Sequence, residues 1–224
     1  MKVRNGASID AEHAEPVLDF VRRARERLAP VAPELPADPA VIPSSGDHAL
    51  APEIADIAKT YPPQSAAVLV PVIARQEPTI LLTQRSAALS NHAGQISFPG
   101  GKLDSADPDP LATALREAQE EIGLDSGYAD PLGYLDPYLS GTGFRIVPVV
   151  ALISPAFQMT INPAEVDEAF EVPLSFLMTP ENHARHSREW KGVQRSFYAM
   201  PYGERYIWGI TAGILRRLYE RLYR

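Results

Sequence analysis

Residues 109–124, "DPLATALREAQEEIGL", constrain the fold more than any other stretch of the chain. Asp109 is a favourable N-cap, and Pro110 suits the first helical position because its missing N–H would have no partner there. Gly123 suits the left-handed residue that ends a helix. The segment therefore predicts an amphipathic helix whose buried stripe consists of Leu111, Ala114, Leu115, Ala118 and Ile122.

Three glutamates lie beside that stripe. Glu117, Glu120 and Glu121 occupy positions i, i+3 and i+4, which share one face of a helix at about 5–6 Å between Cβ atoms. Two like charges about 5 Å apart repel by roughly 3 kcal/mol at an effective dielectric near 20. A positive group is therefore expected between the three carboxylates.

The residue types around the glutamates favour a hard divalent cation. Oxygen ligands without Cys or His suit Mg²⁺ or Mn²⁺, and protein-bound Mg²⁺ usually partners a phosphate group. The Gly100-Gly101 pair is expected to form a turn in which the backbone can lie close to the ion, because glycine has no side chain. The Gly101 carbonyl is therefore a further candidate ligand. Arg116 is expected to pair with an acid and hold the cluster together. These features together predict metal-assisted attack of water on phosphorus.

The segment from Gly101 to Leu124 resembles the Nudix box, G-x5-E-x7-R-E-U-x-E-E-x-G-U, in which U is a bulky aliphatic residue. The matching residues are Gly101, Arg116, Glu117, Glu120, Glu121, Gly123 and Leu124, with the smaller Ala118 at the first U position. One extra residue separates Gly101 from Arg116, and Asp107 stands where the family has its first glutamate. The resemblance implies the layered α/β Nudix fold, in which a mixed sheet is sandwiched between helices.

A narrower resemblance concerns residues 81–104, "LLTQRSAALSNHAGQISFPGGKLD". This stretch is similar to the extended motif of the coenzyme A diphosphatase branch, which reads L-L-T-x-R-S, L-x-x-H-x-G-Q and S-F-P-G-G. "GFRIVPVV" and "YIWGITAGIL" also resemble that branch, so the likeness covers residues 65–218. It implies hydrolysis of the pyrophosphate of coenzyme A to 3′,5′-ADP and 4′-phosphopantetheine, with Mg²⁺ or Mn²⁺.

The resemblance also assigns roles to individual residues. Glu117, Glu120 and Glu121 would ligate the metal together with the Gly101 carbonyl. Arg116 would orient a carboxylate. The identity of the carboxylate that deprotonates water varies within the superfamily, and Glu120 is one candidate.

A further acid often reaches Nudix sites from a downstream loop, as a ligand or as the base. "NPAEVDEAFEVPL" offers Glu165 as the first choice and Glu168 as the second. The expected catalytic set is therefore Glu120, Glu121, Arg116 and Glu165. The candidate contacts to substrate phosphates are Arg85, Arg145 and Lys102. For the two arginines, a surface salt bridge is an equally good interpretation.

The amino-acid composition limits the classes of molecule that the chain is expected to bind. A formal charge of −7 argues against a basic nucleic-acid-binding surface. The chain has no cysteine, which excludes disulfides and thiolate metal sites. The charged N-terminus lacks the apolar core of a signal peptide, and no apolar run is long enough to span a membrane. We therefore expect a cytoplasmic protein that acts on a small diphosphate and binds neither nucleic acid nor membrane.

The chain is expected to divide into an N-terminal arm, residues 1–60, and a hydrolase domain, residues 61–224. The arm, a candidate homodimer contact, should hold a helix over 10–29, a Pro-rich connector over 30–46 and a short helix over 52–61. Apolar runs and turn residues in the domain predict strands at 65–74, 79–86, 94–101 and 144–153, and a strand that passes into a helical turn within 170–178. They also predict a hairpin turning at Lys191-Gly192 and a closing helix over 206–223.

Two other functions remain open. The first is a Nudix enzyme for another substrate, such as ADP-ribose or a dinucleoside diphosphate. The extended motif disfavours it but does not exclude it, because the Nudix box recognises only the diphosphate and its metal ions. A Nudix-fold binding module that has lost catalysis is the alternative from another class. The intact Arg116 and helix carboxylates give no support to such a loss.

Overall fold

The structure is a computed structural model, and it describes residues 15–35, 37–88, 93–190 and 192–224. Residues 10–14 of the expected first helix, His92 of the extended motif and Lys191 of the expected hairpin turn lie outside the described residues. The helices are α2 (Glu15–Arg27), α3 (Glu53–Lys59), α4 (Pro110–Ile122), α5 (Leu174–Leu177) and α6 (Ile210–Tyr223). The strands are β1 (Ser45–Gly46), β2 (Gln64–Ile73), β3 (Thr79–Arg85), β4 (Ile96–Ser97), β5 (Gly100–Lys102), β6 (Ala129–Tyr134), β7 (Tyr138–Leu139), β8 (Phe144–Ile153), β9 (Val166–Pro173), β10 (Ala184–Trp190), β11 (Val193–Tyr202) and β12 (Arg205–Trp208).

A mixed nine-stranded sheet forms the centre of the described chain. β2 pairs in parallel with β8 along all ten of its residues. β2 and β3 form the expected hairpin, but they pair only at Val72–Ile80 and Ile73–Thr79. Beyond that point β2 pairs with β5 and β3 pairs with β4, while β9 pairs with β3 from Thr79 to Arg85. The separation of β2 from β3 therefore makes room for the short strands on either side of the Phe98-Pro99 dipeptide.

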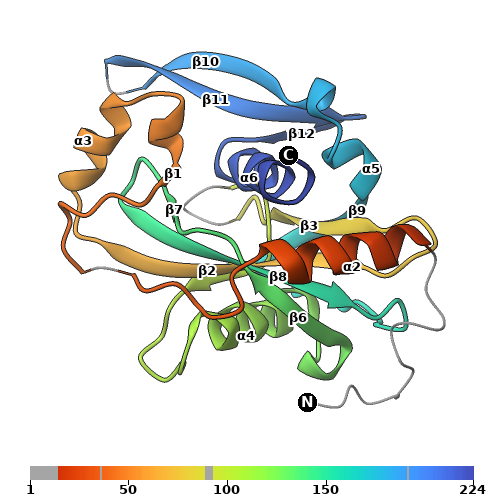
Figure 1. The fold of residues 1–224 in the computed structure, drawn as a ribbon. Helices are drawn as coiled ribbons and strands as arrows, with labels where there is room; N and C mark the ends of the chain where they lie inside the picture. The colour runs from red at the N-terminus through yellow and green to blue at the C-terminus, as the bar shows by residue number, and fades with distance from the viewer. Residues whose placement is uncertain (1–14, 36, 89–92, 191) are drawn as a thin grey trace.

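Helices cover both faces of this sheet (Figure 1). α4 packs on one face, where Ala114, Ala118 and Ile122 join a buried cluster with the sheet. α2 and α6 pack on the opposite face in a larger cluster, and the three-stranded sheet β10-β11-β12 lies over α6. The expected layered α/β architecture, with a mixed sheet between helices, is confirmed.

The signals at the ends of α4 act as expected. The Asp109 side chain accepts a hydrogen bond from the Ala112 backbone N–H at 2.8 Å, and Pro110 occupies the first turn. Gly123 ends the helix in the left-handed region, with φ 70°. A cap of this kind contributes about 1 kcal/mol. The helix that carries the glutamates therefore has fixed ends.

The N-terminal segment joins the same core. Val17 and Phe20 of α2 belong to the cluster that contains the buried face of α6. Burial of such side chains contributes about 1.5–3 kcal/mol each. Further along, Ala29 bridges Tyr134, and β1 pairs in parallel with β7. α2 is thus packed against its own chain, and the division at residue 60 stays a prediction.

Two predicted elements differ from the structure. Gly100 and Gly101 lie within strand β5, where Gly101 pairs with Ala67, and not in a turn. The closing helix begins at Ile210 because the residues before it form β12 and pair with β11. Gly209, with φ 66°, makes the change from strand to helix. The strands β1, β6 and β7 had no counterpart in the sequence prediction.

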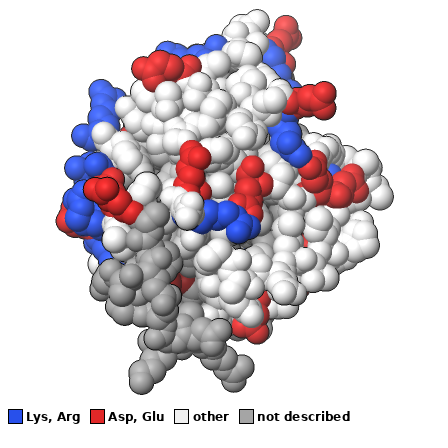
Figure 2. Space-filling model, turned by 90° about the vertical axis from the view of Figure 1, so that its right-hand side faces the viewer, with Lys and Arg blue, Asp and Glu red and all other residues white. Residues whose placement is uncertain are grey.

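Figure 2 shows acidic and basic side chains interspersed on one face of the molecule, without a broad basic patch on that face. Within the described residues, no helix is long and apolar enough to cross a membrane.

Candidate active site

The site begins where α4 passes close to β5. A Cβ atom on Gly101 would lie 2.4 Å from both Cδ and Oε1 of Glu117. Any residue larger than glycine would therefore displace that carboxylate. The Gly-Gly pair permits the close approach that its sequence predicts, although it does so from within a strand.

The three glutamates of α4 have different surroundings. Glu121 faces the sheet and is 3% exposed, and its Oε2 has no hydrogen-bond partner in the described part of the chain. The Glu120 side chain is 49% exposed. Glu117 lies between these extremes, with its side chain mostly buried. The shared face predicted from their spacing therefore runs from the protein interior to the solvent.

Arg116 holds the outer two of these carboxylates. Its Nη1 donates to Glu117 Oε1 at 2.8 Å and to Glu120 Oε2 at 3.2 Å. Its Nη2 donates to the Lys102 carbonyl at 3.3 Å, which ties the helix to β5. Arg116 thus takes the position expected for it, between the acids.

Asp107, at the position where the box departs from the family, completes this arrangement. It accepts from Arg116 Nη2 at 3.0 Å and from Thr113 Oγ1 at 2.8 Å. The hydrogen bonds from Arg116 lower the pKa of Asp107 to about 2. Asp107 is therefore a permanent anion that fixes the guanidinium. Sequence reasoning missed Thr113, which lies six residues after Asp107 on the buried side of the helix.

Glu165 approaches the glutamates from the loop before β9. The Asn162 backbone N–H donates to the Glu121 carbonyl at 2.9 Å, and the Asn162 side chain donates to Glu165 Oε1 at 3.1 Å. The charge of Glu165 raises the pKa of both Glu117 and Glu121, so the three acids lie within electrostatic reach of one another. Sequence reasoning missed Asn162, although the Asn-Pro dipeptide is a turn signal.

The second candidate acid has a different partner. Glu168 accepts a hydrogen bond from Arg205, whose guanidinium carbon lies 4.2 Å from the centroid of the Phe170 ring. Phe170 belongs to the core on the α6 side of the sheet. The structure therefore brings the first-choice acid, Glu165, to the helix glutamates and pairs Glu168 elsewhere.

Two of the three cations proposed as phosphate contacts lie at this end of the sheet. Arg85 ends β3, and its positive charge acts on Glu121. Its Nε is buried without a hydrogen-bond partner among the described residues. Lys102 is exposed, and its Nζ lies 5.6 Å from the centroid of the Phe144 ring.

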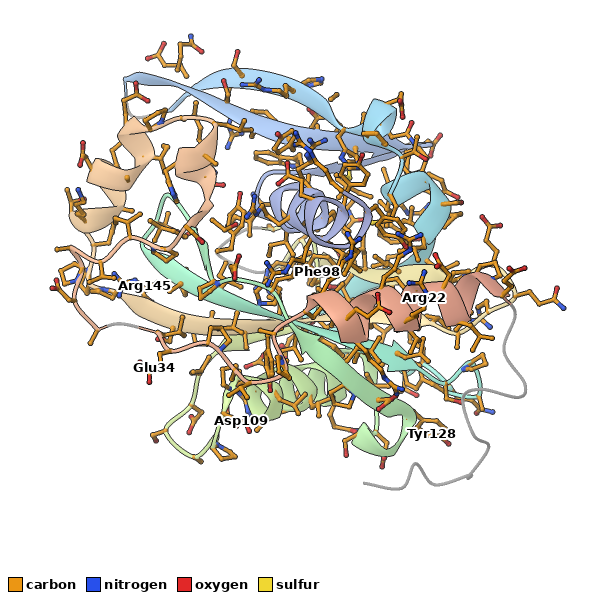
Figure 3. The ribbon with its side chains drawn as sticks, in the orientation of Figure 1. Arg22, Glu34, Phe98, Asp109, Tyr128 and Arg145 are labelled. Atoms are coloured by element: carbon orange, nitrogen blue, oxygen red, sulfur yellow. The ribbon has the colours of Figure 1, made fainter. Side chains whose placement is uncertain are left out.

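Arg145 has other contacts. It is 2% exposed, and its Nη2 donates to the carbonyls of Asp38 at 2.7 Å and Val41 at 2.9 Å. It lies beside the N-terminal segment that follows α2 (Figure 3). These contacts tie down the Pro-rich connector and do not join Arg145 to the glutamates. The sequence suggested either a surface salt bridge or a phosphate contact for Arg145. Its hydrogen bonds to backbone carbonyls correspond to neither interpretation.

Comparison with known proteins decides the family. The NUDIX domain model matches residues 63–194. The chain belongs to the Nudix hydrolase family. Over 157 residues it is 42% identical to an uncharacterised Nudix hydrolase, NudL, of Photorhabdus laumondii, covering 70% of this chain and 84% of that relative. The expectation of a Nudix enzyme is confirmed.

Solved Nudix structures share the fold more loosely. A binary complex of the C. elegans Ap4A hydrolase covers 50% of this chain and 81% of its own, with TM-score 0.40 and 17% identity. The Nudix domain of Shewanella oneidensis NrtR, complexed with ADP ribose, covers 50% of this chain and 74% of its own, with TM-score 0.40 and 22% identity. These likenesses leave the substrate of this Nudix chain open.

The electrostatics of the Nudix site centre on Glu121. Burial raises its pKa to about 8, and the neighbouring charges of Glu117 and Glu165 act in the same direction. The positive charge of Arg85 opposes them. Burial also raises the pKa of Glu117. At neutral pH these effects therefore favour the protonated form of Glu121 unless a cation is bound.

The donors fit a divalent ion, which Nudix hydrolases generally use. Within the described residues, no group of three acidic or histidine side chains is placed to hold a metal ion. Glu117 and Glu120 each accept a hydrogen bond from Arg116 instead. The observation in favour is the buried, unpartnered oxygen of Glu121. The carboxylate has a hydrogen bond from the Gly100 backbone, but a buried charged oxygen without a partner is costly, and a hard cation would compensate its charge.

Proposed function

We propose that the chain hydrolyses the pyrophosphate bond of coenzyme A or a derivative, with Mg²⁺ or Mn²⁺, to give 3′,5′-ADP and 4′-phosphopantetheine. The metal-dependent chemistry is carried by one observation, the buried Glu121 oxygen without a partner beside Glu117 and Glu165. The choice of substrate rests on the extended motif of residues 81–104.

The proposed metal ligands are Glu117, Glu120, Glu121 and the Gly101 carbonyl. A divalent ion bound there lowers the pKa of water and polarises a phosphoryl oxygen. Release of Glu117 or Glu120 from Arg116 would free carboxylate oxygens for this purpose. Both hydrogen bonds are partly or fully exposed to solvent, and such pairs contribute little to stability.

The remaining polar residues have proposed roles in orientation and proton transfer. Arg116, fixed by Asp107, sets the positions of the helix carboxylates. Glu165 or Glu120 takes a proton from the attacking water. Arg85 contacts a phosphate, because its buried Nε lacks a partner and its charge already acts on Glu121. Lys102 is the second candidate phosphate contact.

The test is product chromatography after incubation with coenzyme A and with ADP-ribose, each with Mg²⁺, with Mn²⁺ and with chelator. Metal-dependent release of 3′,5′-ADP from coenzyme A, without cleavage of ADP-ribose, is the expected result. Cleavage of ADP-ribose alone would keep the mechanism and reject the substrate. No cleavage of either, with metal bound, would favour the binding-module alternative. Parallel assays with oxidised and acylated coenzyme A would define the preferred form.

A matched pair of variants makes this test specific. Glu120→Gln should abolish turnover while the protein stays folded. Glu26→Gln changes an exposed helix glutamate in α2, which pairs with Arg22, and should leave turnover unchanged. Equal activity of the two variants would reject the assignment.

The partner and location proposals are a homodimer and the cytoplasm. Light scattering of the full chain at several concentrations tests the first. A mass of one chain throughout would reject the dimer.

A further inference from the structure

The loop before β9 is held by backbone hydrogen bonds on two sides. On the helix side, the Asn162 N–H donates to the Glu121 carbonyl at 2.9 Å. On the sheet side, the Ser86 N–H donates to the Glu165 carbonyl at 2.8 Å. These bonds fix the path of the main chain past the glutamates of α4. They leave the torsions of the Glu165 side chain free.

The Glu165 carboxylate lies beside other acids, because its charge raises the pKa of both Glu117 and Glu121. A half-buried glutamate in such surroundings can turn towards solvent unless a donor holds it. Among the described residues, Asn162 Nδ2 donates that hydrogen bond, to Glu165 Oε1 at 3.1 Å.

The Asn162 side chain is itself fixed. Its Oδ1 accepts from the Ala164 N–H at 3.1 Å, and its carbonyl accepts from the Val166 N–H at 2.9 Å. The side-chain amide therefore spans a turn, with its oxygen used for the turn and its NH₂ group directed at the carboxylate. This arrangement orients a donor rather than merely closing a loop.

We propose that Asn162 is a positioning residue that holds the Glu165 carboxylate beside Glu117 and Glu121. The proposal rests on the proposed function, in which Glu165 is the additional acid of the metal site. A misplacement of about 1 Å in a reacting group can lower a rate by about 10²-fold. Loss of this single hydrogen bond should therefore affect catalysis far more than stability.

The experiment is a double-mutant cycle of Asn162→Ala and Glu165→Gln in the full chain. One measurement is kcat and KM for the diphosphate, and the other is affinity for Mn²⁺ alone, from water-proton relaxation. Asn162→Ala should lower kcat by about 10–100-fold with KM nearly unchanged, and weaken Mn²⁺ binding by about tenfold. The double variant should match Glu165→Gln in both measurements.

Asn162→Asp separates positioning from turn formation. Its carboxylate keeps the acceptor for the Ala164 N–H but loses the donor and adds a like charge next to Glu165. We expect an unchanged melting temperature and a loss of kcat at least as large as for Asn162→Ala. The matched control is Asp125→Asn in a similar turn, where Oδ1 accepts from the Gly127 N–H at 2.7 Å, and it should behave as wild type.

Several results would overturn the proposal. These are wild-type kcat and Mn²⁺ affinity in Asn162→Asp, effects that multiply in the double variant, or a Glu165→Gln variant unchanged in both measurements. If the wild type binds Mn²⁺ but hydrolyses no diphosphate, the proposed function fails while the Mn²⁺ cycle still tests Asn162. A wild type that does neither would overturn both proposals.

Discussion

Two carboxylates of this protein are buried to nearly the same extent in opposite surroundings. Asp47, 5% exposed, accepts hydrogen bonds from Tyr138 Oη at 2.9 Å, from the Gly141 N–H at 3.1 Å and from Arg195. Glu121, 3% exposed, has one oxygen to which no described residue donates a hydrogen bond. Its neighbours include two further acids.

The difference distinguishes a carboxylate that the protein itself satisfies from the one that we propose as a metal ligand. The Asp47 network is satisfied by the protein itself, so it can join the N-terminal segment to β7 and β11 without a ligand. The surroundings of Glu121 cost free energy in the isolated chain, and the rest of the fold must compensate. Unsatisfied burial of this kind is typical of sites that bind an ion or carry out chemistry.

The largest expected effect that tests this comparison is that of Glu121→Gln. Turnover should fall by at least about 10³-fold, because the variant removes the central proposed ligand. The free energy of unfolding of the metal-free protein should not fall, since an uncharged amide replaces a group that burial disfavours in its charged form. Steady-state kinetics and urea denaturation with chelator measure the two effects. Wild-type turnover would break the comparison.

Asp47→Ala should show the opposite result. Each buried donor left without its acceptor costs about 1–3 kcal/mol of unfolding free energy. Asp47→Ala removes the acceptor of Tyr138 Oη and of the Gly141 N–H. Turnover per folded molecule should stay at the wild-type level. The control is Asp130→Ala, which breaks an exposed pair with Arg25 and should cost about 1 kcal/mol or less. Similar denaturation curves for the two variants would contradict the prediction.

Alanine substitutions at two neighbouring glycines should likewise separate a loss of catalysis from a loss of stability. Gly101→Ala meets the mobile end of Glu117, so we expect a kcat about 10–100-fold lower and an almost unchanged melting temperature. Gly100→Ala meets the Ala67 carbonyl oxygen at 2.4 Å, which is backbone and cannot turn away. It should lower the unfolding free energy by about 1–3 kcal/mol. Identical effects on stability would refute the distinction.

The last expected effect, small for each pH unit, is a pH slope in the stability of the metal-free protein. The folded-state pKa of Glu121 is raised to about 8 from an ordinary value of 4.5. Between these values the folded chain holds a proton that the unfolded chain releases. Stability should therefore fall as pH rises across this window, by at most about 1.4 kcal/mol per unit. Urea denaturation with chelator should show a flatter profile for Glu121→Gln, and equal slopes would count against the shift.

Much of the fold could be predicted where its signals are local. Asp109 and Gly123 act on residues next to them, so the bounds of α4 follow from the sequence. β8 is one apolar run, and its bounds agree with those predicted. The segment before Gly209 was less predictable, because its aromatic residues fit a helix or a strand and only pairing with β11 decides between them.

The same distinction holds within the site. Arg116 contacts Glu117 and Glu120 on its own helix, and these contacts could be expected from their spacing. Arg145 could not be placed, because its carbonyl partners lie 107 and 104 residues earlier in the chain. Nothing in the sequence near an arginine shows whether a distant backbone or a phosphate accepts its hydrogen bonds.

The Asp47–Arg195 pair also sets an order of events during synthesis. The two residues are 148 positions apart. At about 5–20 residues per second, a ribosome needs roughly 7–30 s to make the intervening chain. Until then Asp47 remains hydrated and the N-terminal segment lacks the contact that joins it to β11. Final docking of that segment therefore has to wait until most of the polypeptide has been translated.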